Sequence, residues 1–161
     1  MCGSGEKWKK VCFCGVFWKY PIKNKELVVE HGTTMIESRK RFVILCHGSF
    51  NYIKNKTGNM LIRYRQDEVL AIIDNTKVGK TSDSELGYGG EIPVVADFES
   101  CLSYSPDTLV IGNASQGGFI SDEYRKEVMK AIESGCDIIS GMHQFLVDDP
   151  ELSKAAAKYG V

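Results

Sequence analysis

Five short apolar runs between residues 41 and 141 constrain the fold of this chain more than any other feature. The runs are RFVILCHG, EVLAIIDN, IPVVAD, TLVIGNA and CDIISG. Apolar runs of this kind indicate strands that are buried on both faces, as in parallel sheets. Because amphipathic segments separate the runs, the sequence predicts an α/β fold in which helices cover both faces of a parallel sheet.

The segments between the runs have helical periodicity and recognisable ends. The clearest helix is predicted to begin after Ser121, a favourable N-cap residue, and to end at Gly135. Its apolar residues share one face: Tyr124, Val128, Ala131 and Ile132. A closing helix is predicted from the Asp149-Pro150 pair to Gly160. The segment KTGNMLIRYR is predicted to be a helix with three apolar residues on one face: Met60, Leu61 and Tyr64.

Length and charge indicate one domain with an extension. The chain has 161 residues, which suits a single domain. Residues 1–40 carry 8 Lys/Arg and 4 Asp/Glu, whereas residues 41–161 carry 12 and 17. We therefore expect an irregular N-terminal extension over 1–40 and the domain over 41–161. The net charge of −1 gives no indication of nucleic-acid binding. The apolar run at residues 11–18 is too short for a transmembrane segment, although a membrane-surface role for it stays open.

The cysteines indicate a reducing compartment. Cys46, Cys101 and Cys136 are isolated within apolar runs, which is typical of small buried residues. No CxxC pair occurs, so no metal site is predicted. The simplest location is the cytoplasm.

Candidate ligand contacts lie in the loops that follow the predicted strands, because ligands bind outside the carboxyl ends of parallel strands. The first loop contains His47, Gly48 and Ser49. Asp74 ends the second strand, 26 positions after Gly48, near the interval of roughly twenty at which dinucleotide-binding folds place a ribose-binding acid. The GxGxxG fingerprint is missing, and an aspartate that binds its own loop is the open alternative.

Val78-Gly79-Lys80-Thr81 resembles the end of a phosphate-binding loop, but the match is incomplete. Asp74 stands where such a loop needs a glycine, and coil is expected to continue to Gly90. We therefore interpret the segment as a polar loop in which Lys80 can contact an anionic ligand as a point charge.

The loops after the fourth and fifth runs hold the remaining candidates. In GNASQGG the glycines allow a turn over a ligand, and three side chains offer hydrogen bonds: Asn113, Ser115 and Gln116. A flexible connection is the alternative. His143 is the candidate general base, and His47 joins it if both line one crevice, whereas a structural role is the alternative for each.

From about residue 41 to residue 160 the chain resembles the Rossmann-like N-terminal domain of a two-domain family long catalogued as of unknown function. The segments that carry the resemblance are LIRYRQDEVLAIIDNTKVGKT, LGYGGEIPVV, PDTLVIGNASQGG, DIISGMHQFLVDDPEL and AAAKYG. The resemblance implies N-acetylation of D-amino acids, notably D-glutamate, with acetyl-CoA. Six motif positions are carried over as candidate ligand contacts: Asp74, Lys80, Thr81, Gly117, Gly118 and His143.

In that family a P-loop nucleotide-binding domain follows the Rossmann-like domain, and it is expected to begin where these 161 residues end. We therefore expect this polypeptide to bind a small anionic ligand, acetyl-CoA or a nucleotide, and to be incomplete as an enzyme by itself. Two alternatives stay open, an NAD(P)-binding oxidoreductase domain and a non-catalytic assembly module. The sequence leaves homo-oligomerisation undecided.

Overall fold

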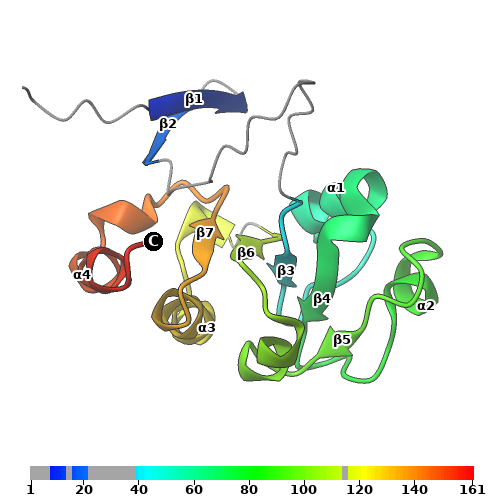
Figure 1. Ribbon diagram of the computed structural model, residues 1–161. Coiled ribbons are helices and arrows are strands. Elements are labelled where there is room, and N and C mark those ends of the chain that lie inside the picture. The colour runs from blue at the N-terminus through cyan, green and yellow to red at the C-terminus, as the bar shows by residue number, and fades with distance from the viewer. Residues whose placement is uncertain (1–7, 14–15, 22–38, 114–115) are drawn as a thin grey trace, which may run out of the picture. The chain divides into compact units, whose positions relative to one another are not determined.

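The structure, a computed structural model, describes residues 8–13, 16–21, 39–113 and 116–161 (Figure 1). Its contacts divide the chain into two units, Met1–Glu37 and Ser38–Val161. In the first unit, β1 (Trp8–Phe13) and β2 (Val16–Pro21) pair in antiparallel register. The structure thus has strands at these residues, where the sequence analysis expected an irregular extension. The domain boundary at residue 41 stays a prediction.

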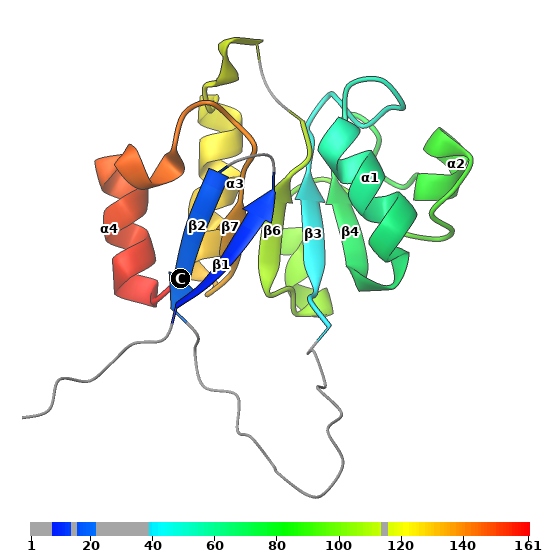
Figure 2. The same ribbon diagram turned by 90° about the horizontal axis from the view of Figure 1, so that it is seen from above.

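The second unit contains a five-stranded parallel sheet, as the sequence predicted. Its strands are β3 (Phe42–Leu45), β4 (Val69–Ile73), β5 (Val94–Val95), β6 (Thr108–Ile111) and β7 (Asp137–Ile139). They lie in the order β5-β4-β3-β6-β7, and every neighbouring pair is parallel. Figure 2 shows four of them, β4, β3, β6 and β7, side by side. The chain moves outward from β3 to β5 and then returns to the other side of β3. The strand order therefore reverses between β3 and β6.

Helices lie on both faces of this sheet, which confirms the Rossmann-like α/β fold. The α-helices are α1 (Lys56–Arg65), α2 (Ser82–Leu86), α3 (Asp122–Glu133) and α4 (Pro150–Tyr159). Short 3₁₀ helices span Gln66–Glu68, Glu99–Tyr104, Gln116–Gly118 and Leu146–Asp148. Figure 1 shows α1 and α3 on opposite faces. Among the described residues, no helix is both long and apolar enough to cross a membrane.

The apolar core is divided by the sheet into two clusters. Alternate residues of a strand point to opposite faces. On β3, Ile44 belongs to the cluster that contains Ile62 of α1, whereas Leu45 belongs to the cluster that contains Val128 of α3. All four residues are fully buried. This two-sided burial explains why β3 is apolar at every position.

The ends of α3 and α4 follow the sequence prediction. The Ser121 hydroxyl accepts a hydrogen bond from the backbone N–H of Tyr124, and the predicted apolar face of α3 is buried. The Asp149 carboxylate accepts from two N–H groups in the first turn of α4. Gly135 (φ 82°) and Gly160 (φ 74°) follow the two helices in the left-handed conformation that glycine favours.

Two local predictions were wrong. Met60 and Tyr64, predicted on the apolar face of α1, are 50% and 72% exposed, and the buried residues of that helix are Gly58, Asn59 and Ile62. A small and a polar residue are buried because α1 lies very close to the sheet at Gly58. The segment before Gly90 is also not continuous coil, since it contains α2.

Candidate functional site

The carboxyl ends of β3 and β6 are adjacent, because these strands pair directly at the reversal of strand order. We call residues 46–49 after β3, together with residues 112–113 after β6, the switch-point edge. In open α/β sheets a ligand binds at this place. Gly48 is exposed and Ser49 is half-buried, so the loop after β3 reaches the surface here.

Asp74 at the end of β4 holds this loop in place. Its carboxylate accepts hydrogen bonds from the N–H groups of Gly48 (3.0 Å) and Phe50 (2.9 Å), and from the N–H and hydroxyl of Thr76 (2.9 and 2.7 Å). The side chain has no exposed surface. Burial by itself raises the pKa of Asp74, but the hydrogen bonds from Thr76, Phe50 and Gly48 outweigh burial and lower the pKa below its ordinary value. In the structure Asp74 thus binds its own loop and the loop after β3, and its contact with a ligand stays a prediction.

A buried histidine and tyrosine join the ends of β3 and β6. The backbone N–H of Asn75 donates to Nδ1 of His47 over 3.2 Å. The His47 ring makes an edge contact with the Tyr124 ring, with centroids 5.9 Å apart and an interplanar angle of 86°. The Tyr124 hydroxyl donates to Oδ1 of Asn113 over 2.7 Å. Burial raises the pKa of Tyr124, so this hydroxyl stays protonated as a donor.

Sequence reasoning had placed Tyr124 in the core only. A buried tyrosine on the apolar face of a helix has a hydroxyl that needs a hydrogen-bond partner. This requirement was the signal in the sequence that could have indicated a polar role for Tyr124. The sequence did not indicate that the partner is Asn113, because Tyr124 and Asn113 meet only after α3 has packed against the sheet.

The start of α1 packs closely against the end of β6, next to the switch-point edge. The N–H of Gly58 donates to the carbonyl of Gly112 over 3.2 Å. A Cβ atom at Gly112 would lie 2.1 Å from Oδ1 of Asn55, and one at Gly58 would lie 2.5 Å from the same atom. Two glycines thus let the helix and strand approach without a GxGxxG sequence. The N-terminus of α1 has no side-chain cap and no acidic residue in its first turn, which leaves it favourable for a negative charge.

The loops after β6 and β7 are joined at a second place. A Cβ atom at Gly118 would lie 2.7 Å from Cδ2 of His143, so the imidazole rests directly against this glycine. Gly117 and Gly118 have φ values of 83° and 73°. The N–H of Gln144 donates to the Gly118 carbonyl over 3.1 Å. The structure therefore brings His143 and Gly118 together, and His143 is exposed.

Two candidates from this region have no described side chain. Gln116 begins the short helix Gln116–Gly118, but only its backbone is described, and Ser115 lies outside the described residues.

Lys80 and Thr81 lie beside β5, at the edge of the sheet that is opposite to β7. The N–H of Val94 in β5 donates to the Lys80 carbonyl over 2.9 Å. The Thr81 hydroxyl accepts from the N–H of Ser84 over 3.3 Å and caps α2. Four strand spacings of about 4.8 Å separate β5 from β7, or roughly 19 Å. The two residues therefore do not meet His143.

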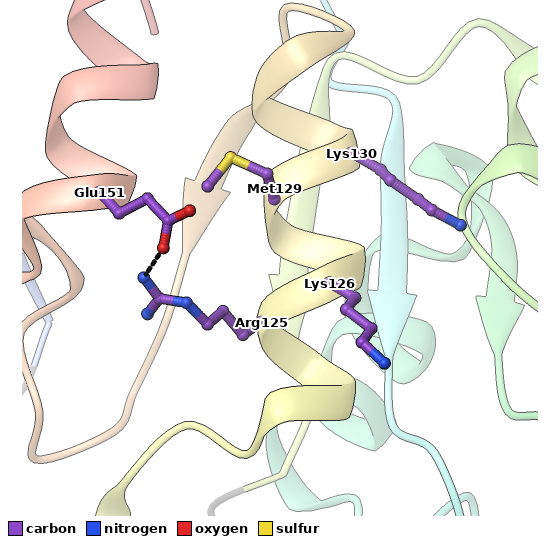
Figure 3. Close-up of a pocket in the computed structure, with 5 residues that line it drawn as sticks. All are labelled: Arg125, Lys126, Met129, Lys130 and Glu151. Atoms are coloured by element: carbon purple, nitrogen blue, oxygen red, sulfur yellow. Dashed lines mark hydrogen bonds and ion pairs between the residues drawn. The ribbon is translucent and has the colours of Figure 1, made fainter.

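A surface pocket of about 280 Å³ lies along α3 and α4 (Figure 3). Its lining residues are Arg125, Lys126, Met129, Lys130 and Glu151. The Arg125 guanidinium is paired with Glu151 at 2.6 Å and also with Asp149, and Lys130 is paired with Glu99 at 3.1 Å. Because Arg125 and Lys130 already have carboxylate partners, the pocket is a weaker candidate for an anionic ligand than the switch-point edge. In the described part of the chain, no group of three His, Cys, Asp or Glu residues is arranged to hold a metal ion.

Comparison with known proteins gives consistent results. A family model described as a domain of unknown function, DUF1611_N, Rossmann-like domain, matches residues 75–161, which are 87 of the 161 residues. A curated protein from Tritonibacter scottomollicae named D-glutamate N-acetyltransferase is 47% identical over 63 residues. That match covers 39% of this chain and 19% of the relative.

A solved structure is also similar. The crystal structure of a DUF1611 family protein from Anabaena variabilis superimposes with a TM-score of 0.67 and 34% sequence identity. The match covers 72% of this chain and 33% of that protein. The chain thus spans about a fifth of the curated relative and a third of the solved one.

Proposed function

Since this chain belongs to the DUF1611_N family of Rossmann-like domains, we propose that it is the ligand-binding domain of a D-amino-acid N-acetyltransferase and holds acetyl-CoA or a related nucleotide. The observation that carries the proposal is the 47% identity to a protein named D-glutamate N-acetyltransferase. Because the match covers 19% of that relative, the complete reaction is proposed for the longer protein and ligand binding for this chain.

The switch-point edge is the proposed binding place. The Ser49 hydroxyl and the uncapped N-terminus of α1 offer hydrogen-bond donors to phosphate or carbonyl oxygens, whereas the Gly48 N–H is already bound to Asp74. Asn113 lies beside them at the end of β6, with its Oδ1 already bound by Tyr124. Asp74 supports the loop and does not present its carboxylate to the ligand, since it is completely buried.

The proposed chemistry is acyl transfer to an amine. The amine nitrogen attacks the thioester carbonyl carbon of acetyl-CoA, the carbon–sulfur bond breaks and the CoA thiol leaves. The attacking amine must first lose a proton, so a base is needed. His143 is exposed and rests against Gly118 at the same carboxyl edge of the sheet, and we assign it this role.

The nicotinamide alternative has less support. It required the acid at the end of the second strand to accept hydrogen bonds from ribose hydroxyls. In the structure, that acid accepts four hydrogen bonds from its own loops and is fully buried.

Isothermal titration calorimetry of the full chain with acetyl-CoA, CoA, ATP and NAD tests this proposal. We expect saturable binding of acetyl-CoA and CoA, and weaker or undetectable binding of NAD. The variant His143→Ala tests whether the ligand binds at the carboxyl ends of the strands. Lys80→Ala is the matched control, because both side chains are exposed but Lys80 lies beyond β5. Absence of heat with all four compounds would refute nucleotide binding and leave the assembly-module interpretation.

A further inference from the structure

The histidine at the switch-point edge has one ring nitrogen in a hydrogen bond and the other without a partner among the residues that the structure describes. Nδ1 of His47 accepts a hydrogen bond from the Asn75 N–H, whereas among the described residues nothing accepts from Nε2. An imidazole nitrogen that accepts an N–H bond carries no proton, so the neutral ring has its proton on Nε2. The engaged nitrogen therefore fixes Nε2 as a hydrogen-bond donor.

This donor reaches the surface although the ring is buried. His47 is 9% exposed. Within the described residues, Asn55 Oδ1 is the only side-chain nitrogen or oxygen that is both inaccessible to solvent and without a hydrogen-bond partner. Nε2 of His47 has no partner among the described residues either and is not one of their inaccessible atoms, so within this part of the chain it is accessible. The exposed part of His47 thus includes its free donor.

The ring is held in one orientation by its neighbours. Tyr124 contacts it edge-on at 5.9 Å, and Tyr124 is itself fixed by its hydrogen bond to Asn113. The side-chain amide of Asn75 donates to Oε1 of Glu123 over 2.7 Å, which anchors the residue whose backbone binds Nδ1. A donor held in this way costs little reorganisation when an acceptor arrives.

We propose that His47 binds the ligand, donating a hydrogen bond from Nε2–H to an acceptor oxygen. The inference rests on the proposed function, because the acceptor is an oxygen of acetyl-CoA. It assigns Tyr124 and Asn75 as positioning residues that act through His47. His47 is then a donor, whereas His143 is the base.

Nitrogen NMR of the full chain with labelled histidine tests the inference directly. The spectra are recorded at about pH 8.5, two units above the ordinary pKa of a histidine side chain, where the tautomer of a neutral imidazole is measurable. We expect the Nε2–H form for His47 and a shift of its Nε2 signal on addition of acetyl-CoA. A shift with acetyl-CoA alone assigns the acceptor to the thioester carbonyl, and a shift with CoA as well assigns it to an oxygen that both molecules carry, in a phosphate or in the pantetheine arm. An Nδ1–H tautomer in the free protein would overturn the inference.

Calorimetry on the same sample separates this inference from the proposed function. Acetyl-CoA binding without a change at His47 overturns the inference alone, whereas absence of binding overturns both. Three variants give an independent readout. The amide nitrogen of His47→Gln lies near the position of Nε2, and that of His47→Asn lies near Nδ1. We expect about tenfold weaker acetyl-CoA binding for His47→Asn and His47→Ala, and recovery of most of the affinity in His47→Gln. Equal losses in all three variants would contradict a donor role.

Discussion

Substitution of Gly112 by alanine tests the contact that brings α1 against the switch-point edge. The new Cβ would lie 2.1 Å from Asn55 Oδ1 and 2.7 Å from Ile44 Cγ2. Both distances are far below the 3.4–4 Å of an ordinary van der Waals contact. The φ angle of Gly112 lies outside the left-handed region, so the contact itself is the only source of strain.

The expected loss of stability is about 2 kcal/mol. Overpacking of a closed site costs about 1–3 kcal/mol. Alanine recovers about 0.4–1 kcal/mol by restricting the unfolded chain. The neighbours have little room to move, because Asn55 and Ile44 are fully buried. The upper end of the overpacking range, about 3 kcal/mol, therefore applies, and the net loss is about 2 kcal/mol. For a domain of this size the melting temperature should fall by roughly 6–10 °C.

Urea unfolding of single and double variants measures the effect. Asn55→Ala removes the nearest atom, so Gly112→Ala should cost at least about 1 kcal/mol less in that background. The Ile44 contact remains, so the rescue should be partial. Gly141→Ala is the matched control, because nothing lies within 4 Å of a Cβ at Gly141. If Gly112→Ala is as stable as Gly141→Ala, or if its cost is unchanged by Asn55→Ala, the close contact is not present as described.

Three further predictions concern single side chains. Asp74→Asn should lose about 2–4 kcal/mol of stability in urea unfolding, because an amide NH₂ would face N–H donors. The pKa of Asp74 is lowered in the folded protein. The stability that its carboxylate contributes is therefore complete above the unfolded pKa of about 3.9 and is lost as the pH falls through the folded pKa. A stability difference between the native protein and Asp74→Asn that stays constant down to about pH 2 would contradict this. Thr81→Ala should cost about 1 kcal/mol through loss of the α2 cap and leave acetyl-CoA affinity unchanged, and weaker binding with normal stability would place Thr81 at the ligand. Burial raises the pKa of Cys46 well above its usual value, that of Cys101 to about 12 and that of Cys136 to about 11. Peptide mapping after iodoacetamide treatment at pH 8 should find these three thiols modified only in the unfolded protein, and equal labelling of the native chain would show that they are accessible.

The sequence by itself determined the elements of the domain and many of their ends. Apolar runs marked the strands, and Ser121 and Asp149 marked where α3 and α4 begin. These signals are local, since a cap bonds within one turn and a buried strand shows its burial at every position. The amphipathic segments between the runs also indicated the α/β class.

Only the tertiary structure decided the order of the strands and the partners of the polar side chains. Asp74 and Lys80 are close in sequence, yet Asp74 is buried against the loop after β3 and Lys80 lies outside β5. Tyr124 contacts His47, which is 77 positions earlier in the chain. Such pairs form only when helices pack on the sheet, because long-range contacts depend on which strands become neighbours. The sequence therefore identified polar candidates at the ends of the strands, and the packing of β3 against β6 determined which of them lie together.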